Sequence, residues 1–166
     1  MAKYKVAGRT FKVYVVVDAS KSVPQILPDS EKDKSKDNPN IKVEWAEFLY
    51  WDWKLMTKIT RDARNIDNTV DPIKLRELKL RYLLLDWSLE EDGKKIEIKR
   101  KKEKNDIIES ITPECFEEIS KVNPLIIITF LNKADLVLEL GAEEEDFFIG
   151  NSPNTGETSS PEVKQN

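Results

Sequence analysis

The side chains able to carry chemistry are mostly carboxylates and amines, because the chain contains no histidine and a single cysteine. Without histidine, a Ser-His-Asp or Cys-His nucleophile system and a His-ligated zinc site are excluded. Cys115 stands alone, which excludes an internal disulfide framework and a site built from several thiolates. Its position next to Phe116, in a helix-forming stretch, favours a small buried side chain over a nucleophile.

Two short motifs are similar to parts of nucleotide-binding sites. Asn132-Lys133-Ala134-Asp135 has the Asn-Lys-x-Asp pattern that contacts guanine in GTP-binding proteins, and Leu83-Leu84-Leu85-Asp86 has the form of a Walker B strand. Phosphate binding also needs a glycine-rich loop that ends in Gly-Lys-Ser/Thr. None of the five glycines is followed by Lys-Ser or Lys-Thr. We therefore expect neither motif to bind a nucleotide, and we expect residues 132–135 to lie inside a helix.

The densest group of carboxylates is Glu143-Glu144-Glu145-Asp146. It lacks the spaced oxygen ligands and the turn glycine of a calcium loop, and contiguous acidic side chains repel one another and stay solvated. The sequence therefore predicts no metal site, no cofactor and no catalytic residue, which is the pattern of a non-enzymatic protein.

A basic stretch contains Lys99, Arg100, Lys101 and Lys102. No aromatic residue lies within it to stack on a base, and the whole chain is acidic, with a net charge of −4 and a pI near 5.1. Nucleic acid is therefore disfavoured as a partner. The stretch is either a solvated loop or an ionic contact with an acidic protein.

Aromatic residues are concentrated in one short segment. We predict a helix over residues 41–65, and around this helix the rings point in several directions. Either the helix is buried on several sides, or part of its aromatic surface contacts another protein. In both cases one of Trp45, Phe48 and Trp53 has to be more than a third exposed. The candidate partner-binding residues are Trp45, Phe48, Tyr50, Trp51 and Trp53.

The elements that position these residues indicate an α+β chain of 166 residues. The predicted units are an N-terminal β-hairpin unit (1–28), a charged loop or linker (29–40), a mainly helical domain (41–149) and a disordered tail (150–166). The hairpin is expected to turn at Ala7-Gly8-Arg9, between residues 3–6 and 10–17. Further elements are predicted as a helix over residues 72–87 capped by Asp71, a turn at Asp92-Gly93, a strand at 95–99, a helix from Ser110 or Thr112 to Lys121, and a helix over 125–140 capped by Asn123 and ended by Gly141.

Apolar runs in the chain are short. Val13–Val17 is too short for the core of a secretory signal, and Leu125–Leu131 is far below the ~20 residues that span a bilayer. The sequence therefore predicts no contact with a membrane. It also predicts a cytoplasmic location, which is the host cytoplasm if the protein is viral.

The stretch from residue 84 to residue 132 resembles the tail assembly chaperones of long-tailed, siphovirus-like bacteriophages. The resemblance is carried by Leu84-Leu85-Asp86-Trp87-Ser88-Leu89, the acidic turn Glu90-Glu91-Asp92-Gly93-Lys94, and Thr112-Pro113-Glu114 before a short apolar helix. A low-complexity C-terminal segment that contains Asn151-Ser152-Pro153 is also similar to the ends of these chaperones.

The resemblance implies a protein without enzymatic activity that binds the tape-measure protein and aids assembly of the tail tube. The partner is then the tape-measure protein, the tail-tube protein or a second copy of the chain. Two other interpretations stay open from the sequence. One is a structural virion component, such as a tail-completion or head-tail connector protein, and the other is a small regulatory protein associated with nucleic acid.

Overall fold

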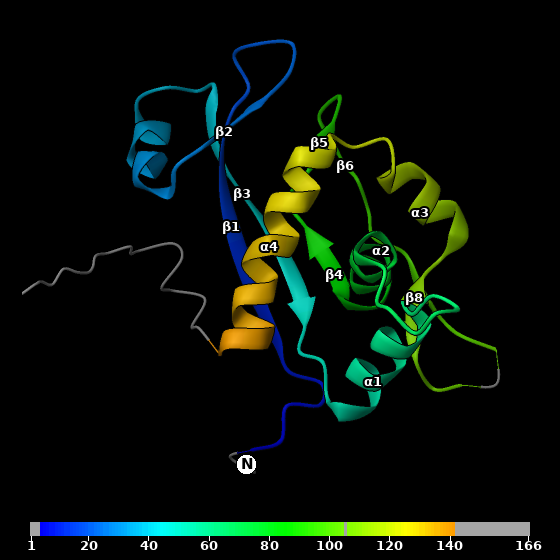
Figure 1. Ribbon diagram of the computed structural model, residues 1–166. Helices are drawn as coiled ribbons and strands as arrows, with labels where there is room; N and C mark the ends of the chain where they lie inside the picture. Colours follow the sequence, from blue (N-terminus) through cyan, green and yellow to red (C-terminus); the bar gives the residue numbers. More distant parts are fainter. Residues whose placement is uncertain (1–3, 105, 142–166) are drawn as a thin grey trace, which may run out of the picture.

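The computed structural model describes residues 4–104 and 106–141 and has the predicted α+β composition (Figure 1). Its helices are the 3₁₀ helix η1 (Asp29–Lys36), α1 (Trp53–Asp62), α2 (Pro72–Leu83), α3 (Pro113–Ile119) and α4 (Pro124–Leu140). Its strands are β1 (Thr10–Asp18), β2 (Gln25–Leu27), β3 (Ile41–Leu49), β4 (Leu84–Trp87), β5 (Glu90–Glu91), β6 (Lys94–Lys95), β7 (Arg100–Lys102) and β8 (Glu109–Ile111).

A four-stranded antiparallel sheet with the order β2-β1-β3-β4 forms the centre of the fold. β1 and β3 are paired along their whole length, from Thr10 opposite Leu49 to Asp18 opposite Ile41. Two small antiparallel pairs, β5-β6 and β7-β8, lie outside this sheet. Arg100 at the start of β7 is thereby placed near the end of α2, where it contributes to the site described below.

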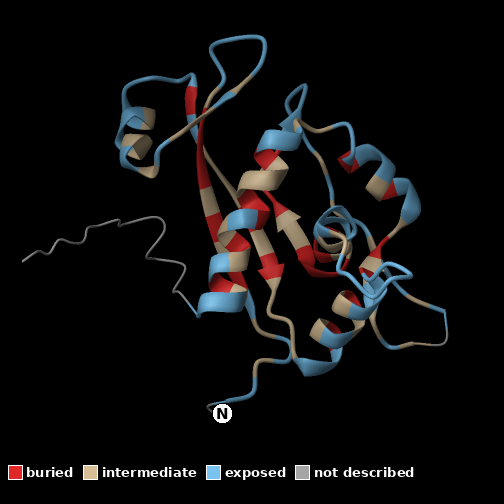
Figure 2. Cartoon of the chain, viewed as in Figure 1, coloured by how far each residue is buried: buried red, intermediate tan, exposed pale blue. Residues whose placement is uncertain are grey.

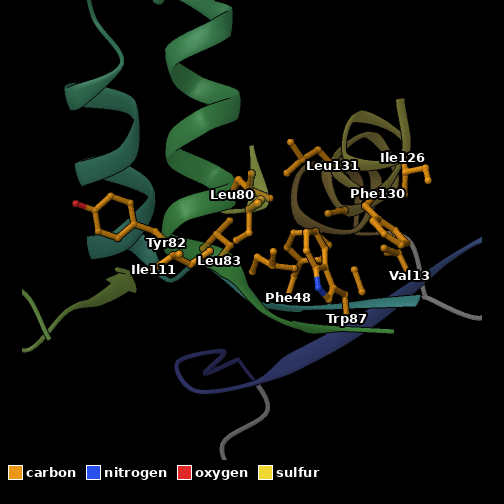
Figure 3. Packing of buried hydrophobic residues seen from close by; sticks show 14 of the residues in the cluster. Val13, Phe48, Leu80, Tyr82, Leu83, Trp87, Ile111, Ile126, Phe130 and Leu131 are labelled. Carbon is orange, nitrogen blue, oxygen red and sulfur yellow. The ribbon is translucent and has the colours of Figure 1, made fainter. Parts of the chain in front are cut away.

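The core lies between one face of the sheet and the helices α2 and α4 (Figures 2 and 3). Phe11 opposite Phe48 and Val13 opposite Ala46 place apolar side chains on this face, because directly paired residues of an antiparallel sheet point to the same side. Trp87 is fully buried there, and its indole Nε1 donates to the carbonyl of Ile96 at 2.7 Å. The tryptophan is therefore both packed and hydrogen-bonded.

The predicted N-terminal hairpin has its turn in the wrong place. Gly8 does adopt a turn, with a φ of +80° and Arg9 N–H donating to the Val6 carbonyl, but residues 4–7 form no strand. The hairpin partner of β1 is β2, and the longer partner is β3. Pairing with the nine residues of β3 satisfies more backbone groups than a short lysine-containing N-terminal segment does. The described parts of the predicted units 1–28 and 41–149 thus share one sheet and one core.

The predicted helix over residues 41–65 is also wrong in its first half, which is strand β3. The spacing of Ile41 and Phe48 fits one face of a helix, whereas Ala46 and Phe48 also fit one face of a strand. Pairing with β1 on one side and β4 on the other decides for the strand. A helix starts only at Trp53, after Asp52 has capped it by accepting a hydrogen bond from Leu55 N–H at 2.9 Å. The helix predicted over 72–87 likewise ends at Leu83, and residues 84–87 form β4.

The charged segment 29–40, predicted as a loop or linker, contains the 3₁₀ helix η1. Local 3₁₀ hydrogen bonds satisfy its backbone while none of its side chains is buried, so the segment is ordered without entering the core. The side chain of Asp29 accepts a hydrogen bond from Lys133 of α4, which ties η1 to the rest of the molecule.

The predicted N-caps of the helices after residue 70 and the predicted end of the last helix are confirmed. Asp71 caps α2, Thr112 caps α3 and Asn123 caps α4, each through its side-chain oxygen, and Gly141 ends α4 with a φ of +69°. Asp92 and Gly93 form the predicted turn with positive φ values. The predicted strand at 95–99 is reduced to β6, and the predicted tail 150–166 lies outside the described residues.

Candidate protein-binding site

An apolar cleft of about 330 Å³ opens where β3 ends and α1 begins. It is lined mainly by aliphatic and aromatic side chains, and charged side chains stand at its rim. The hollow beside β5 and β6, by contrast, is lined mostly by charged residues. The apolar lining is Leu49, Tyr50, Leu55, Tyr82, Leu85, Ile107 and Ile108, and the charged lining is Asp52, Lys54, Arg100 and Glu109. We call this feature the apolar cleft.

Tyr50 is held at the wall of the cleft by the end of the sheet. Its backbone N–H donates to the Arg9 carbonyl at 2.8 Å, and its ring lies 4.7 Å from the ring of Phe11. Leu55 follows one helical turn later, because Asp52 caps α1 directly after β3. The strand-to-helix junction therefore places an aromatic and an aliphatic side chain side by side in the cleft.

Tyr82 is the largest buried polar side chain in the cleft, and its hydroxyl group donates to Glu103 Oε2 at 2.8 Å. Burial, together with the hydrogen bond to Glu103 and its negative charge, raises the pKa of Tyr82 well above the usual value. The hydroxyl group thus stays protonated at all ordinary pH values. Tyr82 acts here as a hydrogen-bond donor that packs its ring into the cleft.

Arg100 forms another part of the wall and is occupied by backbone groups. Its guanidinium donates to the carbonyl oxygens of Leu84 at 2.8 Å, Tyr82 at 2.9 Å, Glu109 at 3.1 Å and Arg81 at 3.4 Å. Burial lowers its pKa below the usual arginine value. The expected ionic contact at Arg100 is therefore corrected to a structural role, because the donors point at the end of α2.

The other three candidate basic residues, Lys99, Lys101 and Lys102, are exposed on and next to β7. Lys101 and Lys102 line a separate groove with Arg81 and Lys104. The positive charge predicted for this stretch is thus presented by lysines alone. They lie on and just before β7, the first strand of the hairpin whose loop carries Ile107 and Ile108.

Two large apolar side chains extend from this end of the molecule into solvent. Ile107, which lines the cleft, is 76% exposed, and Trp53 is 78% exposed. Trp53 is the first residue of α1 and stands between Asp52 and Lys54, which both line the cleft. The expectation that one of Trp45, Phe48 and Trp53 is more than a third exposed is therefore confirmed.

The aromatic cluster of the sequence is divided among several places in the structure. Phe48 is fully buried in the core and is removed from the predicted contact surface. Trp45 is half-buried with Lys12 Nζ 4.1 Å from its ring centroid, and Trp51 lies under Lys79 Nζ at 4.9 Å. Only Tyr50 lines the apolar cleft, and Trp53 stands beside it. The strand conformation of residues 41–49 explains this division, because alternate residues point to opposite faces.

The motifs in the sequence do not indicate most residues of the cleft. Leu49, Leu55, Tyr82 and Leu85 belong to apolar patterns that indicate core positions equally well. The one distinctive signal is Ile107-Ile108, an aliphatic pair within a charged stretch.

The nucleotide-like motifs have structural partners. Residues 132–135 lie within α4, as expected, where Asp135 accepts from Lys79 at 2.7 Å and Lys133 donates to Asp29 and to the Tyr14 carbonyl. Asp86 pairs with Lys95 at 2.9 Å. These side chains therefore join elements of the fold and do not converge on one point.

Cys115 is buried, as its sequence context predicts. Its thiol sulfur accepts a hydrogen bond from Lys99 N–H at 3.2 Å and donates to the Glu97 carbonyl at 3.3 Å. Within residues 4–104 and 106–141, no group of three or more histidine, cysteine and carboxylate side chains is arranged to hold a metal ion. Over the same residues, no helix has the length and apolar character needed to cross a membrane.

Comparison with known proteins adds no relative: no family model, no curated protein and no solved structure matches this chain.

Proposed function

We propose that this protein is a non-enzymatic tail assembly chaperone of a long-tailed bacteriophage that binds the tape-measure protein and aids assembly of the tail tube. The observation that carries the proposal is the apolar cleft, together with the exposed side chains of Trp53 and Ile107 at its edge. A cleft lined in this way accepts the apolar face of an amphipathic helix, with aromatic and aliphatic anchors around it.

The charged residues at the rim of the cleft are suited to binding a helix of the tape-measure protein. Lys54 and Glu109 are exposed, while Asp52 and Arg100 are half-buried and already hydrogen-bonded within the protein. A partner helix would thus bury apolar side chains in the centre and meet charges of both signs at the rim. Contacts of this type fix orientation and contribute little affinity when they stay exposed.

The residues of the family resemblance form the scaffold beside the cleft. Leu84–Leu89 contains β4, in which Leu85 lines the cleft and Trp87 enters the core. Residues 90–94 form the β5-β6 turn, and Thr112 caps α3. The resemblance therefore falls on positions with structural roles in this fold, which supports the proposal that the scaffold is shared.

The proposal is tested by co-expressing the full chain with the tape-measure protein encoded in the same genome, followed by size-exclusion chromatography with light scattering. We expect a soluble complex that contains both proteins. Ile107→Asp should weaken the complex at least tenfold, about 1.4 kcal/mol, because a carboxylate would then face the apolar cleft. Ile73→Asp is the matched control, since Ile73 on α2 is 74% exposed and does not line the cleft.

Equal binding by the Ile107→Asp and Ile73→Asp variants would contradict the assignment of the cleft. Failure of the two wild-type proteins to co-elute would contradict the proposed function. A discrete ring formed by the chain alone would favour the connector interpretation.

A further inference from the structure

We propose that the apolar cleft is occupied by the chain's own segment Phe147-Phe148-Ile149 when no partner is bound. This triplet is the one run of three apolar residues in the sequence after Gly141, and Glu143–Asp146 precedes it. Two phenylalanines and an isoleucine in water expose a large apolar area, and the cleft offers aromatic and aliphatic walls to bury it.

A series of contacts connects the last turn of α4 with the wall of the cleft. In the last turn of α4, Glu139 Oε1 is 3.0 Å from Lys79 Nζ, and this nitrogen is 4.9 Å from the ring centroid of Trp51. The chain neighbours of Trp51, which are Tyr50 and Asp52, both line the cleft. In Figure 1, α4 ends on the same side of the molecule as the junction between β3 and α1.

Phe147 is separated from the end of α4 by a connecting segment whose length limits how far the triplet can reach. Phe147 follows Gly141 by six residues. An extended chain covers up to about 3.3–3.6 Å per residue, so these residues span roughly 20 Å. The proposal requires that this span bridges the end of α4 and the cleft, and the NMR comparison below tests it.

Charge complementarity favours the same placement. The acidic run Glu143–Asp146 immediately precedes the apolar triplet, so it would lie at the rim when the triplet fills the cleft. Lys54 lies at the rim, and the exposed Lys101, Lys102 and Lys104 lie in the separate groove on the adjoining hairpin. These lysines outnumber the carboxylates in the two linings, which are Asp52, Glu103 and Glu109. Opposite charges at a rim guide a segment into register even where each pair contributes little to stability.

Tethering favours the chain's own cleft over the cleft of a second copy. A short flexible connection gives an effective concentration in the millimolar range, which exceeds ordinary protein concentrations. The segment is thus expected to bind within one molecule. One further consequence rests on the proposed function. A helix of the tape-measure protein would have to displace the segment from the cleft, so removing the triplet should strengthen binding of the tape-measure protein.

The docking is tested on the full chain alone by comparing methyl NMR spectra of the wild type and the double variant Phe147→Ser/Phe148→Ser. We expect the shift differences to be confined to the methyl groups around the cleft, on Leu49, Leu55, Leu85, Ile107 and Ile108. Val163→Ser, which changes the single aliphatic side chain after Ile149, is the control and should leave these methyl groups unchanged.

A second comparison uses variants of the cleft. In the Ile107→Asp background the double serine change should no longer shift the other cleft methyl groups, whereas in the Ile73→Asp background it should do so as in the wild type. Docking within one molecule also predicts the same spectra after tenfold dilution. Shift differences that are absent, that fall on another surface, or that disappear on dilution would each overturn the proposal. These measurements contain no tape-measure protein, so their outcome does not bear on the proposed chaperone function, which the co-expression experiment tests separately.

Discussion

Arg100 holds the end of α2 through backbone carbonyl groups that the helix itself leaves without partners. Carbonyls in the last turn of a helix lack intrahelical donors, and the guanidinium supplies donors to those of Arg81 and Tyr82 and to Leu84 just beyond the helix. A fourth bond to the Glu109 carbonyl joins β8 to the same side chain. The planar guanidinium group of Arg100 thus connects the end of α2, β4 and the β7-β8 pair.

Replacing Arg100 by lysine should lower the free energy of unfolding by about 1–3 kcal/mol, because one ammonium group cannot reach all four carbonyls and some would be left unpaired. Urea denaturation at neutral pH measures this difference. Lys102→Ala is the control, since this lysine is exposed and its loss should stay within about 0.5 kcal/mol. Equal stability of the two variants would show that the carbonyls are satisfied in another way.

Glu44 introduces a dependence of stability on pH. Burial raises the pKa of Glu44 above the usual value for a glutamate, and a hydrogen bond from Ser88 Oγ at 2.9 Å only partly opposes this shift. The folded state therefore holds the Glu44 proton more tightly than the unfolded state does. The associated stability is present at pH values below 4.5 and is lost as the pH rises through the folded pKa.

Glu44→Gln should consequently raise the melting temperature at pH 7 relative to the wild type, and the difference should vanish near pH 4. Glutamine keeps an oxygen that accepts from Ser88 but carries no charge to desolvate. Thermal melting followed by circular dichroism at the two pH values measures the effect. Glu117→Gln, at an exposed position of α3, should show no such trend. A melting temperature for Glu44→Gln below that of the wild type at pH 7 would refute the argument.

At the scale of elements, α4 is held against its neighbours by two lysine contacts in addition to its apolar face. Lys79 of α2 is only 3% exposed and bridges Asp135 at 2.7 Å and Glu139 at 3.0 Å, both on α4. Lys133 of α4 donates to Asp29 and to the Tyr14 carbonyl on the other side. These bonds fix the rotation of a helix that buries Phe130 and Leu131 in the core.

Removing both partners of Lys79, by Asp135→Asn and Glu139→Gln, should cost about 3 kcal/mol of folding stability, because the ammonium would stay buried without an opposite charge. This value is at the lower end for buried pairs, since the carboxylates are 34% and 49% exposed. Lys79→Met should cost less than half as much, because the carboxylates left behind remain hydrated. Urea denaturation of the three proteins compares them, and the reverse order would contradict this account.

At the scale of the whole molecule, one sheet and one core join segments that are distant in sequence. β1 packs against α4 and pairs with β3, so the beginning and the end of the described chain stabilise each other. The sequence after Ile149 has a different composition, with Val163 as its single aliphatic side chain and no aromatic residue. Such a segment has little apolar area with which to bind the folded part.

Deleting residues 151–166 should therefore leave the melting temperature within about 1–2 °C of the full chain, because almost no burial is lost. This truncation keeps the segment that we propose for the cleft, so the cleft methyl resonances should also stay unchanged. Differential scanning calorimetry measures the melting temperature. A loss of several degrees would mean that residues after Gly150 pack on the folded part.

The features that the sequence determined by itself are those formed within one turn of the chain. Asp71, Thr112 and Asn123 cap helices through backbone groups two or three residues away, and Gly141 ends α4. Residue type and spacing were therefore sufficient to predict where α2 and α4 begin, where α4 ends and that Thr112 is one of two candidate caps of α3. The burial of Cys115 and the helical position of residues 132–135 were likewise predictable. Local hydrogen bonds and backbone preferences are present in the sequence before any long-range contact forms.

The tertiary structure alone decided the conformation of residues 41–49 and the composition of the apolar cleft. Apolar spacing in 41–49 fits a helix as well as a strand, and the choice depends on β1, whose register joins Phe11 to Phe48 across the sheet. The cleft in turn depends on that choice, because a strand that ends at Leu49 brings Tyr50 to the cleft that Ile107 and Ile108 also line. Pairing over such sequence separations is governed by the stability of the whole sheet, which no local pattern of residues contains.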